Sequence, residues 1–480
     1  MTSIPRYKRD KYIFISNLST LTANPDDLIT LNREGYLLSE QFTNSKKIEL
    51  AHWVKKRNNL LISDNGNFSR MKAIAKAFEK EAGTLLDSAL EMFDAQGKLS
   101  TNIFKARDDL IAKIATACQE KTGKLELAKI IERQVIIKPH YLIGLEDYTI
   151  PVLMLCGLMD PVFQPKAEAV KVFQENTCDL YKRQLAGEFG NRKELDKTAK
   201  FLVLHAYDYS SAFQGAKQLT EIPEALAISF GGPMSSRRWI TSLNFGDKIE
   251  MFPEILPEAY LIATALAMGV VNGLNSDVPI HVLGVGSPIL IALIGQLFNQ
   301  SRAVSIDSTA PFKDSNTGKL YGSRYAFLKM KMNKVAAYAL INNKPYTSRT
   351  PYFKRFEQDF PSNWSALRSE LGVTTSTDVN IVVNMLESRQ DLVETHIPFF
   401  SRMRSGNDPM IERLRIDRAG HNYWILRNIC VSIRKKIQQP ENMEKWMKYQ
   451  VERYKKVGSD KWSKAVETAF ELSIKYKKPH

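Results

Sequence analysis

Two blocks of sequence decide the fold: His281 to Pro288 reads HVLGVGSP, and Asp307 to Lys313 reads DSTAPFK. The first block is an apolar strand that ends in a glycine turn, and a helical stretch follows it. The second block follows another apolar run, at 303–306, and places a carboxylate where that strand ends. Strand, turn, helix, strand and acid together predict a βαβ unit with a reactive group at the carboxyl edge of its sheet. Barrel and open-sheet α/β enzymes build their sites at that edge.

Short apolar runs of the same kind recur along the chain, each followed by an amphipathic segment of helix length. They are nearly continuous in apolar character, as buried parallel strands are. The clearest runs lie at 60–63, 141–145, 201–204, 225–229, 280–283 and 303–306. Strands that alternate with helices predict a parallel α/β fold. The length suits a (β/α)8 barrel of the TIM type with insertions, and the residues alone leave an open doubly wound sheet as an equal alternative.

Two regions depart from this alternation. The segment from about 71 to 133 is rich in Ala, Leu, Lys and Glu and is long for one crossover, so we expect a helical insertion there. We assign residues 1–430 to the barrel and residues 431–480 to a basic helical extension dense in Lys, Tyr and Trp. That extension could cover the barrel, contact a phosphate backbone or form a solvated basic helix.

The charge balance indicates a polyanionic partner. The chain has 67 Lys and Arg against 52 Asp and Glu, which gives a formal net charge of +15. Nucleic acid is favoured over a membrane because no basic amphipathic anchor stands out. A basic protein without any functional patch is the alternative.

Cysteine usage and the N-terminus favour a cytoplasmic protein. The four cysteines are scattered, so neither a disulfide framework nor a cysteine-rich zinc site is indicated. Residues 1–12 are charged and lack the apolar core of a signal peptide. The longest apolar stretch, at 259–274, is interrupted by Gly269, Asn272 and Gly273, and it is too short to span a bilayer. We therefore expect no membrane partner.

Polar or glycine residues follow most of the predicted strands. They are Asp64, Glu146, Asp147, Asp208, the pair Gly231 and Gly232, and Asp307. Any single acid could be a helix N-cap, which is the commonest fate of an Asp after a strand. Several acids at one sheet edge would share a cavity and shift one another's pKa values, which favours a catalytic site.

These blocks resemble, in the correct order, the tRNA-guanine transglycosylase superfamily, whose pattern reads roughly HLLGVGTP and then FDCVLPTR. Residues 63–68 are similar to the superfamily's DSGGFQ. The resemblance spans about residues 60–430, and only the block from 280 to 313 is highly specific. It implies that Asp307 is the nucleophile, that Asp64 assists proton transfer and that Phe68 stacks on the bound base.

The resemblance also implies a base-reading set. Residues 139–149 are similar to the strand that leads into the superfamily's FDECTP, which makes Glu146 the base-reading acid and the neighbouring Asp147 its rival. The amides of Gly231 and Gly232 match a GGLAVG block that approaches the base, and Leu283 matches a residue on the base's other face. Tyr207 and Asp208 fall where the superfamily has a Gln-Gly pair, and we assign Lys313 to the nucleic-acid backbone.

The chain departs from the superfamily at its zinc motif, because no CxCxxC occurs. The stretch from Gly420 to Arg427 is similar to the helix HNLYFLLR that carries the superfamily's zinc-binding histidine. Without thiolates nearby in sequence, we interpret His421 as a packed core histidine and expect no metal. The base-binding blocks depart too: Gly66-Asn67-Phe68-Ser69 replaces Gly-Gly-Phe-Gln, and the acid pair is shifted to Glu146-Asp147.

A chain without the zinc motif or an appended RNA-binding module resembles the DNA-modifying branch of the superfamily most. Those enzymes exchange guanine in DNA for a 7-deazaguanine such as preQ0, and they occur in bacterial modification clusters and in phages. The stretch from Lys138 to Asp147 is similar to that branch. The implied partners are DNA, a 7-deazaguanine base and a further protein of a DNA-modification system. A tRNA-guanine transglycosylase and a non-catalytic nucleic-acid-binding paralogue are the alternatives.

Base exchange needs no cofactor if a carboxylate carries it by double displacement. The carboxylate attacks C1′ of an oxocarbenium-like centre and forms a covalent sugar ester, as in retaining glycosidases. A second acid with a different pKa moves the proton on the departing and incoming bases. The implied pair is Asp307 and Asp64.

Overall fold

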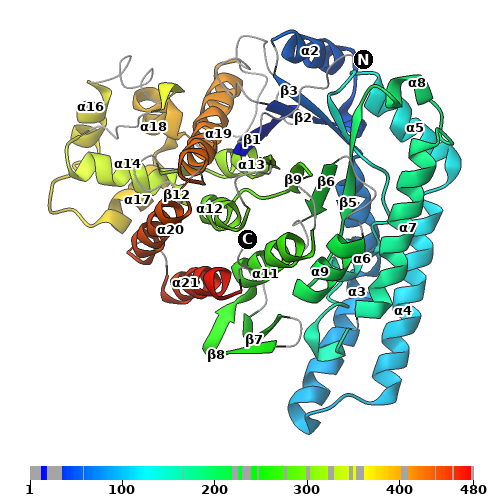
Figure 1. Cartoon of the computed structure of the whole chain (residues 1–480). Coiled ribbons are helices and arrows are strands. Elements are labelled where there is room, and N and C mark those ends of the chain that lie inside the picture. Colours follow the sequence, from blue (N-terminus) through cyan, green and yellow to red (C-terminus); the bar gives the residue numbers. More distant parts are fainter. Residues whose placement is uncertain are drawn as a thin grey trace.

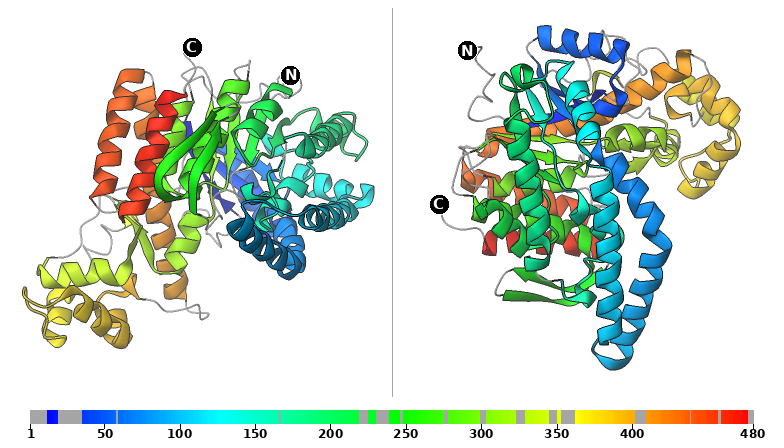
Figure 2. Two further views of the ribbon diagram at one scale, coloured as in Figure 1. Left: turned by 90° about the horizontal axis from the view of Figure 1, so that it is seen from below. Right: turned by 90° about the vertical axis from the view of Figure 1, so that its right-hand side faces the viewer.

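The computed structural model describes most of the 480-residue chain. The described residues are 12–18, 35–57, 59–165, 167–218, 225–229, 239–245, 248–274, 278–298, 303–322, 329–344, 350–352, 362–401, 409–437, 439–456 and 459–476. Figures 1 and 2 show a barrel of strands inside a layer of helices.

Eight parallel strands form a closed barrel in the order β1-β10-β9-β6-β5-β4-β3-β2. Their bounds are β1 Tyr12–Asn17, β2 Gly35–Ser39, β3 Leu60–Asp64, β4 Tyr141–Ile143, β5 Ala199–Leu204, β6 Ala225–Ser229, β9 Ile280–Leu283 and β10 Val304–Asp307. Closure comes from β1, which pairs with β10 on one side (Ile15 opposite Asp307) and with β2 on the other (Ser16 opposite Tyr36). The TIM-type barrel is therefore confirmed, and the open sheet is excluded. All six predicted strands are present, whereas β1 and β2 were not predicted.

Helices and a hairpin occupy the connections between the barrel strands. Before β6 they are η2 Glu40–Phe42, α2 Ser45–Lys56, α3 Asn67–Gln96, α4 Thr101–Glu120, α5 Lys124–Val135, α6 Thr149–Leu155, η3 Pro161–Phe163, α7 Ala167–Leu185, α8 Arg192–Leu195 and α9 Tyr209–Gln218. Between β6 and β10 they are β7 Trp239–Phe245, β8 Lys248–Pro257, α11 Glu258–Gly273 and α12 Pro288–Leu297. Local signals set several ends: Asn44 and Ser100 cap α2 and α4 through their side chains, and Gly97 ends α3 with φ of 68°.

The chain after β10 adds a hairpin and further helices. They are α13 Ala310–Asn316, β11 Lys319–Tyr321, β12 Lys329–Lys331, α14 Met332–Ile341, α16 Asn363–Glu370, α17 Val379–Ser388, α18 Gln390–His396, η4 Pro398–Phe400, α19 Pro409–Ile437, α20 Pro440–Lys455 and α21 Asp460–Lys475. Helices α14, α16, α17 and α18 share a core of their own around Leu340, Leu367 and Val393, and Figure 2 shows them set apart from the barrel.

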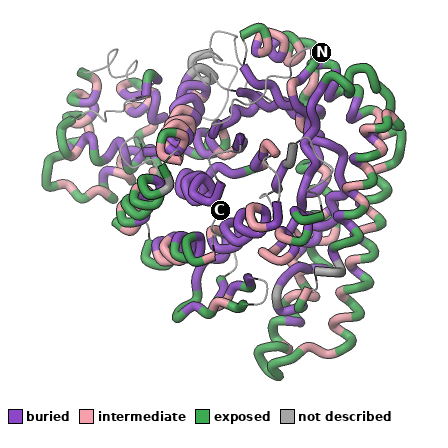
Figure 3. Tube along the Cα trace, in the orientation of Figure 1, coloured by how far each residue is buried: buried purple, intermediate pink, exposed green. Residues whose placement is uncertain are grey.

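The last three helices lie against the barrel. Helix α19 packs on β1 and α12, α20 packs on α12 and α19, and α21 packs on α11 and α20. The expected boundary at 430/431 falls inside α19, which continues to Ile437. The long apolar stretch is α11, which is almost wholly buried beneath α9 and α21 (Figure 3). None of the described helices is long and apolar enough to cross a membrane.

Side chains along each strand point alternately outward, to the helices, and inward, to the centre of the barrel, so the core has two parts. On β10, Val304 and Ile306 face the helices, whereas Ser305 lies on the inward face with Asp307. The inward side chains of the other strands are mostly apolar and fill the barrel, and Tyr141 stacks on Phe201 with ring centroids 4.9 Å apart. The interior is thus packed and mostly apolar, with His281 and Ser305 as buried polar side chains within it.

Candidate active site

Polar side chains from four strands gather at the carboxyl mouth of the barrel. Asp64 is the last residue of β3 and Asp307 the last of β10. Glu146 lies three residues after β4, and His205 directly follows β5. Parallel strands in a closed barrel all end at one rim, so residues far apart in sequence meet there.

Asp64 has the most unusual electrostatic environment of these residues. Burial of its carboxyl, followed by the charges of Asp307 and Glu146, raises the pKa of Asp64 to about 7. Hydrogen bonds from Ser39 and from the Gly66 amide (N to Oδ2, 3.3 Å) oppose the shift. The structure thus brings Asp307 and Glu146 close enough to Asp64 to influence its charge, and near neutral pH Asp64 is divided between its acid and its carboxylate.

Asp307 is buried and sits over the turn after β9. Its Oδ1 accepts a hydrogen bond from the amide of Gly284 at 3.1 Å, and His281 Nε2 lies 3.5 Å from the same oxygen. Gly284 has φ of 80°, a conformation that side chains rarely adopt. A Cβ on Gly286 would lie 2.4 Å from the Cβ of Ala310. The two glycines therefore let this turn approach the loop that carries Asp307.

Glu146 is held by donors on both carboxylate oxygens. Asn65 and Asn67 each donate a side-chain N–H to Oε1 at 2.9 Å, and His205 Nε2 lies 2.6 Å from Oε2. Burial alone would raise the pKa of Glu146, but the charge and hydrogen bond of His205 and the two amides hold this pKa below its usual value. Glu146 is thus an ionised carboxylate near neutral pH, whereas the neighbouring Asp64 is partly protonated.

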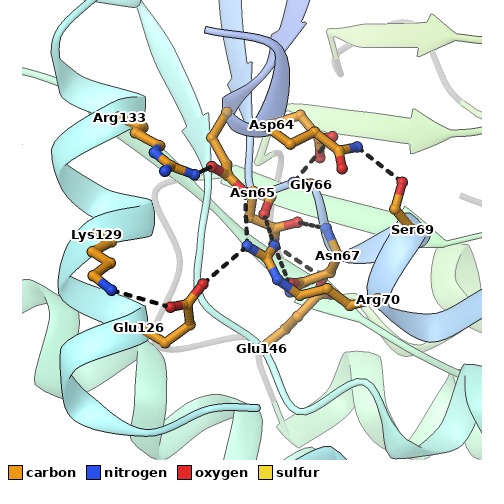
Figure 4. Close-up of polar contacts among 12 residues, drawn as sticks. Asp64, Asn65, Gly66, Asn67, Ser69, Arg70, Glu126, Lys129, Arg133 and Glu146 are labelled. Atoms are coloured by element: carbon orange, nitrogen blue, oxygen red, sulfur yellow. Dashed lines mark hydrogen bonds and ion pairs between the residues drawn. The ribbon is translucent and has the colours of Figure 1, made fainter. Parts of the chain in front are cut away.

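A partly buried network of ion pairs and hydrogen bonds holds the loop that carries Asn65 and Asn67 (Figure 4). Arg70 donates to the carbonyl of Asn65 at 2.8 Å and to the side chain of Asn67 at 3.2 Å. Its guanidinium also bonds Glu40 at 2.8 Å, and Arg133 reaches the other oxygen of Glu40 at 3.2 Å. Charge-assisted bonds of this kind hold geometry well.

Three of the predicted base-binding residues, Asp147, Tyr207 and Asp208, make hydrogen bonds to nearby helices and loops. Asp147 accepts bonds from the amide and hydroxyl of Thr149 at the start of α6, and from Asn176. Asp208 accepts a bond from the amide of Ser211 at 2.7 Å and so caps α9. The Tyr207 hydroxyl donates to the carbonyl of Pro165, and its ring packs in the core formed with α3, α4 and α6. These contacts tie the three side chains to the start of α6, to α7, to α9 and to the segment before α7.

The remaining predicted residues surround the mouth or lie outside the described part. Leu283 ends β9 and packs against the barrel interior. Phe68, in the first turn of α3, is 42% exposed, with Lys72 Nζ 4.6 Å from its ring centroid. Lys313 is exposed on α13, and its pKa is lowered by partial burial and then by the charge of Lys72, which puts two cations near one another. Gly231 and Gly232 lie outside the described residues.

His421 is a core histidine. It is fully buried, with Nε2 2.8 Å from the carbonyl of Tyr321 and Nδ1 2.9 Å from the hydroxyl of Thr350. Burial lowers its pKa to about 4, so it is neutral. Among the described residues, no group of three or more His, Cys, Asp or Glu side chains could hold a metal ion.

Sequence reasoning missed His205, His281 and the two asparagines. His205 carries the same signal as the acids, because it directly follows an apolar strand. Asn65 and Asn67 alternate through the predicted loop at 63–68, and nothing local indicates that they face Glu146. In comparisons with known proteins, no family model and no curated protein matches the chain.

Proposed function

We propose that the protein is a cytoplasmic base-exchanging transglycosylase that replaces guanine in DNA with a 7-deazaguanine of the preQ0 type. The observation that carries the proposal is the pair of acids at the ends of β3 and β10. Asp64 has a pKa raised to about 7 next to the buried carboxyl of Asp307. A double displacement at a sugar carbon requires two neighbouring acids, one as the nucleophile and one to transfer the proton.

In the first step, an oxygen of Asp307 attacks C1′ of the target nucleotide. The bond from C1′ to N9 of guanine breaks, and the departing base takes its proton from Asp64. In the second step, Asp64 removes the proton from N9 of the incoming base, N9 attacks C1′, and the Asp307 carboxylate leaves. A group with pKa near 7 can both give and take this proton at neutral pH.

Glu146 is proposed to read the base. A purine of the guanine type presents N–H donors on the edge that the carboxylate would meet. Oε1 already accepts two bonds and Oε2 accepts one, so Oε2 retains a lone pair for an N–H of the base. Asp147 is less suited, because Thr149 and Asn176 occupy both of its oxygens. Phe68 and Leu283 would contact the two faces of the ring.

The polymer is proposed to be DNA. A target nucleotide in duplex DNA must leave the stack to reach a pocket at a barrel mouth, at a cost of a few kcal/mol. The net charge of +15 and the cations Lys72 and Lys313 support phosphate contacts around that mouth. The preference for DNA over tRNA rests on the absence of a CxCxxC zinc motif from the sequence. A partner that opens the duplex is part of the proposal.

The test is direct exchange. Purified protein is incubated with labelled guanine or preQ0 and with single-stranded DNA, duplex DNA or tRNA under matched conditions, and the nucleosides are analysed by mass spectrometry. We expect label in DNA and none with the Asp307→Asn variant. Label in tRNA alone would replace this proposal with a tRNA-guanine transglycosylase. Tight DNA binding without exchange, also after addition of cell extract, would favour a non-catalytic paralogue.

A further inference from the structure

His281 is a polar side chain in an otherwise mostly apolar barrel interior. In the sheet it lies opposite Ser305 of β10 and Ala227 of β6. It is two residues before the end of β9, on the inward face of the strand. It is fully buried, and its ring lies 5.4 Å from that of Phe201. An apolar side chain would fill this position without the desolvation that an imidazole suffers. The histidine therefore needs a reason beyond packing.

The two ring nitrogens of His281 have different surroundings. Nδ1 lies 2.8 Å from the hydroxyl of Ser305. Nε2 makes no hydrogen bond to any described residue, although it is buried, and it lies 3.5 Å from Asp307 Oδ1. If the Ser305 hydroxyl donates to Nδ1, the neutral ring carries its hydrogen on Nε2 and directs it to the carboxylate.

We propose that His281 is a positioning residue for Asp307 and that Oδ2 of Asp307 is the attacking atom. This rests on the proposed function. Oδ1 would accept hydrogen bonds from the Gly284 amide and from the His281 Nε2–H. Both of these groups lie next to Oδ1 rather than Oδ2. Bonds of this kind are often long without substrate and tighten during the reaction.

The two donors act on both half-reactions. When the bond from Oδ2 to C1′ forms, Oδ1 becomes the carbonyl oxygen of the ester and stays bonded to Gly284 and His281. When the incoming base expels the carboxylate, the returning negative charge is spread onto an oxygen that already faces two donors. Substrate binding uses neither donor, so His281 should affect turnover more than affinity.

The kinetic test compares two substitutions, one without a hydrogen-bond donor and one with an amide donor. His281→Leu removes the donor, whereas His281→Gln places an amide N–H about where Nε2 lies. We expect His281→Leu to lower kcat roughly 10- to 100-fold, with KM for DNA and for the base changed by less than about threefold, and His281→Gln to recover most of kcat. A folded His281→Leu variant with unchanged kcat, or a Gln variant no better than Leu, would overturn the proposal.

A second measurement does not depend on activity. In protein labelled with ¹⁵N-histidine, the His281 signal is assigned from its loss in the Gln variant. We expect the tautomer with hydrogen on Nε2, and we expect Asp307→Asn to move this resonance while leaving that of His421 in place. No movement would overturn the coupling even if exchange occurs. Movement in a protein that exchanges no base would uphold the coupling and reject the proposed function.

Discussion

The two sides of the barrel mouth hold their acids in opposite ways. On the β3–β5 side, Glu146 is bonded to Asn65, Asn67 and His205, and Arg70 and Glu40 lie behind that loop. On the β9–β10 side, Asp307 has one amide donor and a histidine at 3.5 Å, both on one oxygen. A fixed, ionised carboxylate suits recognition, and a carboxylate with one oxygen left for reaction suits attack. Asp64, with its pKa near 7, lies between these two tasks.

The largest effect on activity is expected on the β9–β10 side of the mouth. Asp307→Asn should lower base exchange by roughly 10⁴-fold or more, because the negative charge is needed to attack C1′. DNA binding, measured by fluorescence anisotropy, should be nearly unchanged, since the side chain is buried at the barrel end. If Asp307 only capped a helix, the variant would lose about 1 kcal/mol of stability and keep its activity.

Asp64→Asn should lower turnover by roughly 10²- to 10⁴-fold. Its stability effect has a distinctive sign. The pKa of Asp64 is raised to about 7 in the folded protein, so burying the ionised carboxylate costs folding free energy. This cost appears as the pH rises above the unfolded pKa, about 4, and reaches its full value above pH 7. Because solvent reaches part of the side chain, we expect the Asn variant to be more stable by roughly 1–3 kcal/mol at pH 8. Urea unfolding at pH 4 and pH 8 measures this, and equal differences at both values would contradict it.

Glu146→Gln should have the opposite stability profile. Its pKa is depressed in the folded state, so the ionised form stabilises the protein above the unfolded pKa and that stabilisation is lost in acid. The Gln variant should therefore be less stable than the wild type at pH 7, and the difference should shrink as the pH falls. A gain in stability at pH 7 would show that the Asn65, Asn67 and His205 contacts do not favour the charge.

Glu146 should control the choice of the incoming base more than the turnover rate. Glu146→Ala should raise KM for the incoming base or broaden its choice, because a site built to bond a purine edge is left with unpaired polar groups when the wrong base enters. Competition between preQ0 and adenine measures the change, with Asp64→Asn as the comparison. Equal losses of turnover in the two variants, with unchanged base preference, would remove the division of roles.

The smallest effect is expected at the rim. Lys313→Ala should reduce the salt dependence of DNA binding by about one unit of log–log slope and leave kcat at low salt unchanged. Lys98→Ala is the matched control, because this exposed lysine lies just beyond the last residue of α3, a 30-residue helix that begins at Asn67 beside Glu146. Figure 1 shows the turn between α3 and α4 projecting away from the barrel. Equal slopes for the two variants would place the phosphate path elsewhere.

Much of the fold could be read from local pattern. Buried parallel strands are short and continuously apolar, so six of the eight were predicted, and the acids after them marked the rim. The runs YIFISN of β1 and GYLLS of β2 were not recognised, because a short apolar run cannot be told from a buried helix segment by periodicity alone. Barrel or open sheet could not be decided without them, since β1 alone joins β2 to β10.

The sequence by itself determined that acids end the strands, and it determined which strands these are. Only the tertiary structure decided the task each acid can perform. Glu146 and Asp147 are neighbours, yet one faces Asn65 and His205 across the mouth while the other is bonded to Thr149 and Asn176. The reason is physical: a pKa depends on the dielectric and the charges within a few ångströms, and those come from chain segments far apart in sequence. The closure of the barrel brings them within reach.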